Sequence, residues 1–316
     1  MVCTIPVYLK PGLQTTVQDL GRNGFQQYGI SPSGAMDPYS LQIANLLVGN
    51  RSGEAALEAV LIGPSLEALD SVSIAICGGN LSPRIDGQDV PLWKSRVIKK
   101  GQVLSFGPCK EGGRAYISMA GGINVPLVLN SKSTFVNGKF GGYEGRALKA
   151  GDILHGAPFT VMNRFVHPDL VPKYNQKLTV RVILGPHLEK FTEATIGTFL
   201  TKEYTVSPQS NRMGYQLIGP TLEHSNSADI ISDAIPLGGI QVPASGQPII
   251  LMAERQTTGG YTRIGTVISA DIPLLAQALP GTLIMFKEVG LTEAQDLLKQ
   301  MNRELKWLET GARVCR

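Results

Sequence analysis

The sequence is poor in charged and aromatic residues, and it lacks the long apolar stretches of membrane proteins. Only 17% of its 316 residues are charged, against about 25% in an ordinary soluble domain, and 6% are aromatic. No apolar run approaches the ~18 residues that a membrane-spanning helix needs, and the N-terminus has no basic-then-apolar leader pattern. We therefore expect a protein without membrane segments that resides in the cytoplasm.

Cysteine and histidine are scarce, with four residues of each. The cysteines form no C-x-x-C pair, and the histidines share no spacing typical of metal ligands. We therefore predict neither a metal site nor a disulfide framework. The residues in question are Cys3, Cys77, Cys109, Cys315, His155, His167, His187 and His224.

Several motifs of common enzyme classes are missing as well. The chain has no G-x-x-x-x-G-K-[ST] loop and no strand-associated G-x-G-x-x-G, so a nucleotide would have to be held by other means. No cysteine or histidine is placed as an obvious nucleophile and base, which argues against acyl-enzyme chemistry. The net charge is only +4, and the basic run at 94–100 has no interleaved aromatics. That run is typical of a solvated hairpin, and we expect no nucleic-acid partner.

Glycine and proline are abundant, with 36 and 20 residues, and they separate short β-branched or apolar runs. Such punctuation is typical of β-sandwiches and β-barrels and unlike the pattern of a parallel sheet with long helices. The chain is about two average domains long. The runs predicted as strands include 72–77, 103–106, 114–119, 179–184, 249–252 and 282–286.

Two segments have the spacing of helices that cover β-structure. The first has Asp37 as its N-cap, Pro38 at the first helical position and Gly49 at its end. In the second, Thr292 and Gln295 form a capping box ahead of apolar residues at helical spacing up to residue 308.

The chain contains a diverged internal duplication. Residues 61–67 read LIGPSLE, and residues 217–223, which lie 156 positions further on, read LIGPTLE. Two later matches keep the same order, and the second copy holds about 21 extra residues that include the polar, glycine-rich stretch 254–261. We therefore predict two related β-domains, with a linker near 166–176.

Two polar motifs lie in the first half. Residues 14–22 place amides, hydroxyls, a carboxylate and a guanidinium beside a glycine turn, which suits hydrogen bonding to a small polar ligand. The alternative is a strand and turn with exposed polar residues. The loop 31–37 leads into a helix N-terminus that can hold a carboxylate or phosphate. For Asp37, at the end of this loop, we favour the role of a helix N-cap over that of a catalytic group.

Two further motifs lie in the second half. In the segment 210–215, Arg212 stands near a glycine, so its planar guanidinium could reach a carboxylate or phosphoryl group, although a surface hairpin with an ion pair is the alternative. The stretch 254–261 supplies Glu254 as a candidate acid or base, Arg255 as a cation, and two glycines that allow close backbone approach.

These motifs closely resemble the KipA-like family. That family is also described as the C subunit of prokaryotic 5-oxoprolinase and as biotin-dependent carboxyltransferase or allophanate hydrolase subunit 2. The resemblance covers about residues 5–289, with the motifs in the expected order. It is carried by residues 11–22, 33–37, 44–50, 211–215 and 255–261.

The resemblance implies two cyclophilin-like β-barrel domains, which agrees with the duplication. With the linker near 166–176, the predicted domains are 1–170 and 171–316, the second ending in a helix. It also implies a KipI-like partner, the B subunit of 5-oxoprolinase, and a third partner, the A subunit. The complex would use ATP to open the lactam of 5-oxoproline to L-glutamate. The alternatives are a carboxyltransferase component that acts on urea or a related amide with biotin, and a non-enzymatic antagonist of a KipI-type histidine-kinase inhibitor.

Within the 5-oxoprolinase interpretation, Arg212 and Arg255 would neutralise phosphate or the substrate carboxylate, and Glu254 completes the catalytic set. We expect no metal. The residues expected to bind or orient the substrate are Gln18, Asp19, Asp37, Gln241, Gln256, Thr257, Thr258 and Tyr261.

Two positions depart from the family pattern. The family usually has Asp where this chain has Asn211, which cannot act as a base, and Asp where it has Glu254, which keeps the charge on a longer side chain. The chain also lacks a Met-Lys-Met biotin-carrier tripeptide, so biotin would have to arrive on another chain.

Overall fold

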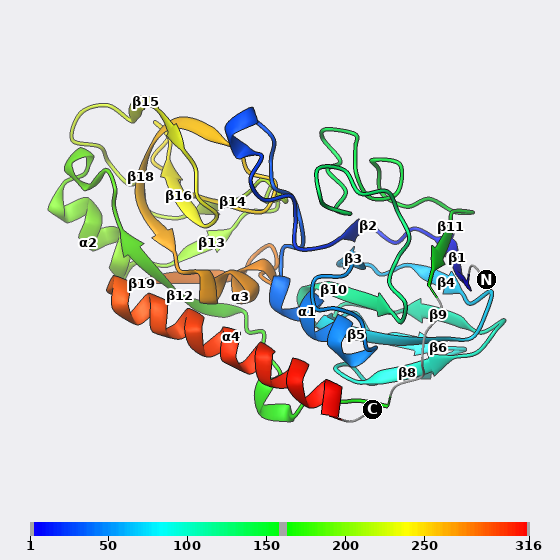
Figure 1. The fold of residues 1–316 in the computed structure, drawn as a ribbon. Helices are drawn as coiled ribbons and strands as arrows, with labels where there is room; N and C mark the ends of the chain where they lie inside the picture. Colours follow the sequence, from blue (N-terminus) through cyan, green and yellow to red (C-terminus); the bar gives the residue numbers. More distant parts are fainter. Residues whose placement is uncertain (1–2, 158–162, 315–316) are drawn as a thin grey trace. The chain divides into compact units, whose positions relative to one another are not determined.

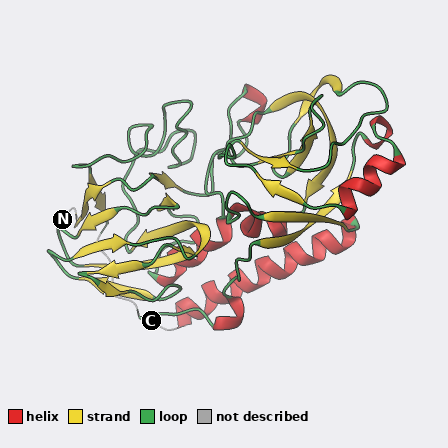
Figure 2. Cartoon of the chain, turned by 180° about the vertical axis from the view of Figure 1, so that it is seen from behind, coloured by secondary structure: helices red, strands yellow, loops and turns green. Residues whose placement is uncertain are grey.

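The computed structural model describes residues 3–157 and 163–314 and divides into two compact units. Unit 1 comprises Met1–Arg22, Ser33–Tyr174 and Arg303–Arg316, and unit 2 comprises Asn23–Pro32 and Asn175–Asn302. Two short segments are thus grouped apart from their sequence neighbours: residues 23–32 belong to unit 2 and residues 303–316 to unit 1. Strands and loops make up most of both units (Figure 2), so the prediction of a mainly β protein with few helices is confirmed.

Unit 1 contains two β-sheets. The six-stranded sheet has the order β11-β1-β4-β9-β6-β7, and the five-stranded sheet has the order β2-β3-β10-β5-β8. All of their pairings are antiparallel. The strands are β1 Cys3–Lys10, β2 Gln14–Gln18, β3 Ala56–Val60, β4 Ser65–Glu67, β5 Val72–Asn80, β6 Pro83–Ile85, β7 Gln88–Asp89, β8 Ser95–Ile98, β9 Val103–Phe106, β10 Glu111–Met119 and β11 Ile153–Gly156.

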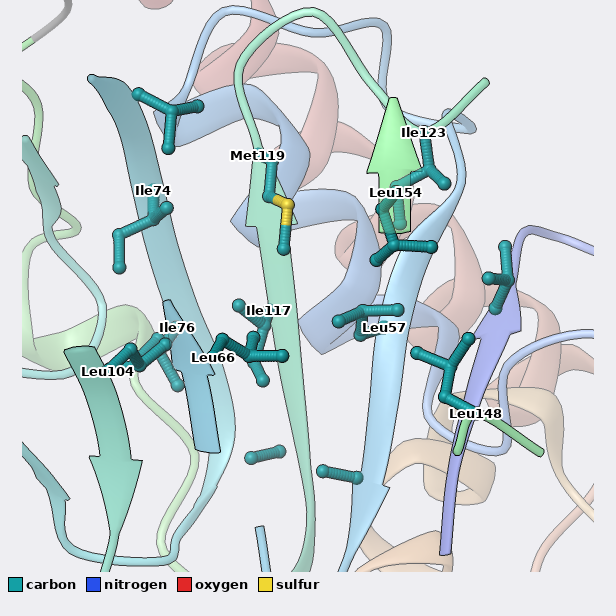
Figure 3. Packing of buried hydrophobic residues seen from close by; sticks show 14 of the residues in the cluster. Leu57, Leu66, Ile74, Ile76, Leu104, Ile117, Met119, Ile123, Leu148 and Leu154 are labelled. Carbon is teal, nitrogen blue, oxygen red and sulfur yellow. The ribbon is translucent and has the colours of Figure 1, made fainter. Parts of the chain in front are cut away.

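The core of unit 1 is built from both sheets (Figure 3). Leu57, Ile74 and Ile117 come from the five-stranded sheet, whereas Leu66 and Leu104 come from the six-stranded sheet, and all five are buried in one cluster. Burial of such side chains contributes about 1.5–3 kcal/mol each. Short strands with many apolar residues are therefore stable here because they meet across one shared core.

Helix α1, Pro38–Leu47, packs on β5 and β10 and begins where the sequence predicts. Asp37 is its N-cap, since its carboxylate accepts a hydrogen bond from the Ser40 backbone nitrogen, and Pro38 occupies the first helical position. Gly49 follows the helix with a φ of 82°, a conformation that glycine adopts without steric cost.

In unit 2 the strands close into a ring, visible in Figure 1. The sheet order is β12-β19-β13-β14-β17-β16-β18, and β12 pairs again with β18, while β15 is attached outside the ring to β18. All pairs are antiparallel except β12 with β19. The strands are β12 Lys177–Leu184, β13 Tyr204–Val206, β14 Gly214–Ile218, β15 Asp229–Ala234, β16 Gly239–Val242, β17 Ile249–Leu251, β18 Thr258–Val267 and β19 Leu283–Glu288.

Two helices of unit 2 are not predicted from the sequence. Helix α2, Glu193–Thr201, stacks Phe199 on Phe286 of β19 with ring centroids 4.3 Å apart. Helix α3, Ile272–Ala276, is a short apolar segment, and the hydroxyl of Tyr215 donates to the Ala276 carbonyl at its end. Short 3-10 turns are found at Gln26–Tyr28, Pro168–Leu170, Leu188–Lys190 and Ser269–Asp271.

Helix α4, Leu291–Val314, is present as predicted, but the predicted capping box is wrong. The Gly290 carbonyl accepts the first helical hydrogen bond from Ala294, so the helix starts before Thr292, which lies in the first turn. Among the described residues, no helix has both the length and the apolar character needed to cross a bilayer.

The duplicated segments share two packing features, although residues 65–67 form β4 and residues 221–223 belong to no strand. Leu66 and Leu222 occupy matching positions and are both fully buried. Gly63 and Gly219 also match, and each lies against an aromatic ring. A Cβ added to Gly63 would stand 2.3 Å from the Phe106 ring, and one added to Gly219 would stand 2.5 Å from the Tyr204 ring. The matching glycines are therefore explained by the same packing constraint in both units.

We expect Gly219→Ala to destabilise the protein by about 1–3 kcal/mol, because the new methyl group would overlap the buried Tyr204 ring. Gly197→Ala is the control, since Gly197 lies in α2 with open space around it and alanine is the better helix former by about 1 kcal/mol. Urea unfolding of both variants measures the difference. An unchanged midpoint for Gly219→Ala would contradict the packing described here.

Candidate functional site

The predicted site residues fall into two groups, one in each unit. Gln18, Asp19 and Asp37 belong to unit 1. The other predicted residues belong to unit 2, where the structure brings most of them together around the end of β17. They are Arg212, Gln241, Glu254, Arg255, Gln256, Thr257, Thr258 and Tyr261.

A buried ion pair joins the two arginine motifs of unit 2. Nε of Arg212 lies 2.7 Å from Oε1 of Glu254, and both side chains are less than one-tenth exposed. The backbones pair as well, since Glu254 N donates to Arg212 O at 2.8 Å and Met252 N donates to Met213 O at 2.9 Å. The turn after β17 is therefore fixed to the loop before β14.

Arg255, the next residue in this turn, is held in a different way. Its Nε donates to the Ile235 carbonyl at 3.0 Å and its Nη1 to the Met252 carbonyl at 3.4 Å, but no carboxylate of the described residues forms an ion pair with it. Burial lowers the pKa of Arg255 to about 10, so the guanidinium remains charged at neutral pH. A buried cation without an anion costs free energy, and a planar guanidinium suits a carboxylate or phosphoryl group. Arg255 is thus a candidate anion-binding residue.

Ile235 connects Arg255 to two other predicted residues. Its backbone nitrogen donates to the Thr257 carbonyl at 3.0 Å, while its carbonyl accepts from Arg255. A Cβ on Gly259 would stand 2.6 Å from Nε2 of Gln241 and 2.7 Å from Cδ1 of Ile235. A side chain at 259 would therefore force the Gln241 amide and the Ile235 side chain to shift.

The remaining predicted residues of unit 2 are more accessible. Gln256 and Thr258 are exposed, and Tyr261 is 44% exposed. Thr258 and Tyr261 lie on β18 where it pairs with β15. Gln256, Thr258 and Tyr261 thus form a solvent-exposed rim, the open margin, next to the buried Arg255.

In unit 1, Asp19 is a buried hydrogen-bond acceptor for one loop. Its carboxylate accepts from Gly21 N at 2.8 Å, Ser131 Oγ at 2.7 Å, Lys132 N at 2.6 Å and Ser133 Oγ at 2.5 Å. The structure therefore gives Asp19 a bracing role between β2 and the loop 131–133. Its predicted role toward a substrate stays a prediction.

Gln18 is fully buried, and its amide is only partly satisfied. Its Nε2 donates to Thr16 Oγ1 at 3.0 Å and to the Thr134 carbonyl at 3.2 Å. Its Oε1 has no hydrogen-bond partner among the residues that the structure describes. An acceptor left open in this way can take an N–H donor.

Asp37 belongs to a buried polar network under the start of α1. Its carboxylate accepts from the nitrogen and hydroxyl of Ser40 at 2.9 and 2.6 Å, so this helix N-terminus already holds an anion from its own chain. Its nitrogen donates to the Tyr116 hydroxyl, which in turn donates to Glu58 at 2.7 Å. Burial, reinforced by the Glu58 and Asp37 carboxylates, raises the pKa of Tyr116 well above its usual value and keeps the phenol protonated.

Several polar residues of these networks are missed by the sequence analysis. Glu58 has a visible signal, because a carboxylate inside the apolar run Ala56–Val60 needs a buried partner. Ser131 and Ser133 carry no such signal in a polar loop. Among groups of His, Cys, Asp and Glu in the described ranges, no set of three or more is arranged to hold a metal ion.

Comparison with known proteins identifies the family. A sequence model described as "Carboxyltransferase domain, subdomain A and B" matches residues 28–288, and the chain belongs to this family. Two bacterial relatives extend over nearly the whole chain. The C subunit of 5-oxoprolinase from Escherichia coli is 39% identical over 303 residues, which cover 95% of this chain and 97% of the relative. The protein of the same name from Haemophilus influenzae is 36% identical over 287 residues, covering 91% and 92%.

Among solved structures, the urea carboxylase of Kluyveromyces lactis is similar with a TM-score of 0.91 and 32% identity. The match covers 98% of this chain and 30% of that protein, so this chain corresponds to less than a third of the yeast enzyme. The urea amidolyase of the same yeast gives the same TM-score and identity over 20% of its length.

Arg212 and Arg255, two of the buried arginines of unit 2, should respond differently to removal of their charge. Arg212→Met removes the cation that pairs with the buried Glu254, and we expect a loss of about 3–5 kcal/mol in unfolding free energy. Arg255→Met removes a cation that has no carboxylate partner among the described residues, and we expect a change within about 1 kcal/mol or a gain.

Urea unfolding at neutral pH measures both variants, and Arg84→Met serves as the control because Arg84 forms an exposed ion pair with Asp89. If Arg255→Met were as damaging as Arg212→Met, Arg255 would be a structural residue, and its assignment to anion binding would fail.

Proposed function

We propose that this protein is the C subunit of an ATP-dependent 5-oxoprolinase and acts with two partners, a KipI-like B subunit and the A subunit. The observation that carries the proposal is the end-to-end similarity to two bacterial 5-oxoprolinase C subunits. Each alignment covers more than nine-tenths of this chain and of the relative. The complex opens the lactam of 5-oxoproline to L-glutamate. We propose that the chain has no activity on its own and works in the cytoplasm.

Arg255 is the residue of this chain that suits the substrate best. The substrate, 5-oxoproline, carries one carboxylate, and Arg255 presents a buried guanidinium with no carboxylate partner among the described residues. Gln241, beside Gly259, would orient the lactam through its amide, and Gln256, Thr257, Thr258 and Tyr261 supply further donors and acceptors along the open margin. Arg212 and Glu254 hold the turn in place, so their contribution is to position Arg255.

ATP would be a co-substrate of the complex. A lactam carbonyl reacts slowly with water, and transfer of the γ-phosphoryl group to its oxygen would activate the carbon toward attack. Addition of one water with breakage of the C–N bond would then give an acyl phosphate, and a second water would release phosphate from it. In the balanced reaction, 5-oxoproline, ATP and two waters give glutamate, ADP and phosphate. No nucleophilic side chain is required, which agrees with a site built from a cation, amides and hydroxyls.

A second candidate function is that of a carboxyltransferase component acting on urea or a related amide with biotin. The similarity to yeast urea carboxylase at a TM-score of 0.91 favours it. Biotin would be delivered by another chain. Avidin separates the two candidates, because it blocks turnover by a biotin-dependent enzyme and leaves the lactam-opening complex unaffected.

The test is ADP release by this chain purified together with its B and A partners, with and without 5-oxoproline. We expect stimulation by 5-oxoproline that disappears when this chain is omitted. Arg255→Met should lower kcat/KM for 5-oxoproline by about 100-fold, mainly through KM, because a charge-assisted contact to the substrate is lost.

Arg84→Met, in the exposed pair with Asp89, should leave turnover unchanged and serves as the matched arginine control. Stimulation that persists without this chain would refute the proposed function. Full turnover by Arg255→Met in an intact complex would refute the role of Arg255 alone.

A further inference from the structure

The outer strand of unit 2 presents one large apolar side chain to solvent. Strand β15 pairs only with β18, and its register is irregular, since Asp229 lies opposite Tyr261 and Asp233 lies opposite Gly259. An advance of four residues along β15 thus corresponds to two residues along β18, so β15 contains a β-bulge. Ile231 lies within this bulge and is 95% exposed, the highest value among the exposed large apolar residues of the described chain.

The bulge explains why Ile231 points outward. The atoms of β15 nearest to a Cβ built on Gly260 are the Ile230 carbonyl oxygen at 3.5 Å and Ser232 Oγ at 3.8 Å. The groups on either side of Ile231 therefore face β18. Bulges re-aim individual side chains in this manner, and they also blunt an edge against simple strand addition.

The charged residues nearest to Ile231 in the sequence are acidic. Between Arg212 and Glu254 the sequence contains Glu223, Asp229 and Asp233 but no lysine or arginine, in a chain whose net charge is +4. Asp233 forms an ion pair with Arg263 and is still half-exposed. Asp229 forms no ion pair with any residue that the structure describes.

We propose that Ile231, flanked by Asp229 and Asp233, docks into a partner protein through an apolar pocket bordered by lysine or arginine. The existence of such a partner rests on the proposed function. A second copy of this chain does not fit, because pairing two such strands would bring like carboxylates together, which is destabilising. We refer to these three residues as the β15 knob.

The β15 knob lies next to the candidate anion site in the sequence and in the sheet. Ile235 directly follows β15, and its carbonyl accepts the hydrogen bond from Arg255. Gly259, which makes room for Gln241, is the partner of Asp233 in the strand register. A protein bound to the β15 knob would therefore adjoin the margin of the Arg255 site and restrict water access to it.

The test measures binding of the full-length chain to its purified A and B partners. We expect Ile231→Ser to weaken binding by at least about 10-fold, as for a central apolar contact of an interface. Its thermal stability should equal that of the wild type, since the side chain is almost entirely exposed. Ile218→Ser, at an exposed isoleucine on β14 of the same unit, is the control and should bind normally.

Charge provides a second readout. Asp229→Asn should slow association and reduce the dependence of binding on salt, because it removes an attractive charge at the interface. Binding of Ile231→Ser within about twofold of wild type would overturn the proposal. Concentration-dependent dimers of the chain that Ile231→Ser abolishes would also overturn it, because the occupant would then be a second copy.

The outcomes also separate this proposal from the proposed function. Loss of binding in Ile231→Ser, with no 5-oxoproline-stimulated turnover by the wild-type complex, would support the β15 knob and refute the 5-oxoprolinase assignment. Stimulated turnover by the wild-type complex, with normal assembly of Ile231→Ser, would support that assignment and refute the docking surface.

Discussion

The ion pair between Arg212 and Glu254 is the contact on which the candidate site of unit 2 depends. It joins two loops that are 42 residues apart in the sequence, and the backbone bonds beside it fix their relative position. Arg255 follows Glu254 directly, so its guanidinium is placed by this contact. Ile235, Thr257 and Gln241 are then arranged around Arg255. A charged pair at this depth contributes little net stability, but removal of one member deprives the other buried charge of this partner and is destabilising.

Two buried charges of the predicted site, Asp19 and Arg255, are accommodated in different ways. In unit 1 the carboxylate of Asp19 is surrounded by neutral donors from one loop, so the charge is satisfied within the chain. In unit 2 the guanidinium of Arg255 donates to two carbonyl oxygens and to no carboxylate of the described residues. The first arrangement strengthens a fold. The second leaves electrostatic attraction available for a ligand, at the cost of desolvation when the site is empty.

Much of the fold could be predicted from the sequence because its signals are local. Strands follow from β-branched runs between glycine and proline, and α1 follows from Asp37 and Pro38. Helix α2 has an N-cap, Thr192, but Gly197 and several β-branched residues weaken its intrinsic propensity. The stacking of Phe199 on Phe286 contributes to its stability and cannot be read from the local sequence. The candidate site, too, is predicted only where its signals are local. The motifs identify Arg212 and Arg255, but which arginine is paired with Glu254 depends on contacts that no spacing reveals.

The ring of strands in unit 2 also has a consequence for synthesis of the chain. It is closed by β12, the first strand of the ring in the sequence, which lies between β18 and β19, the last two. Until residue 288 has emerged from the ribosome, β12 and β13 each lack a neighbour and present open edges. Such edges recruit other chains, and pairings between distant segments form slowly. The nascent second unit therefore depends on protection from aggregation until its last strand has been made.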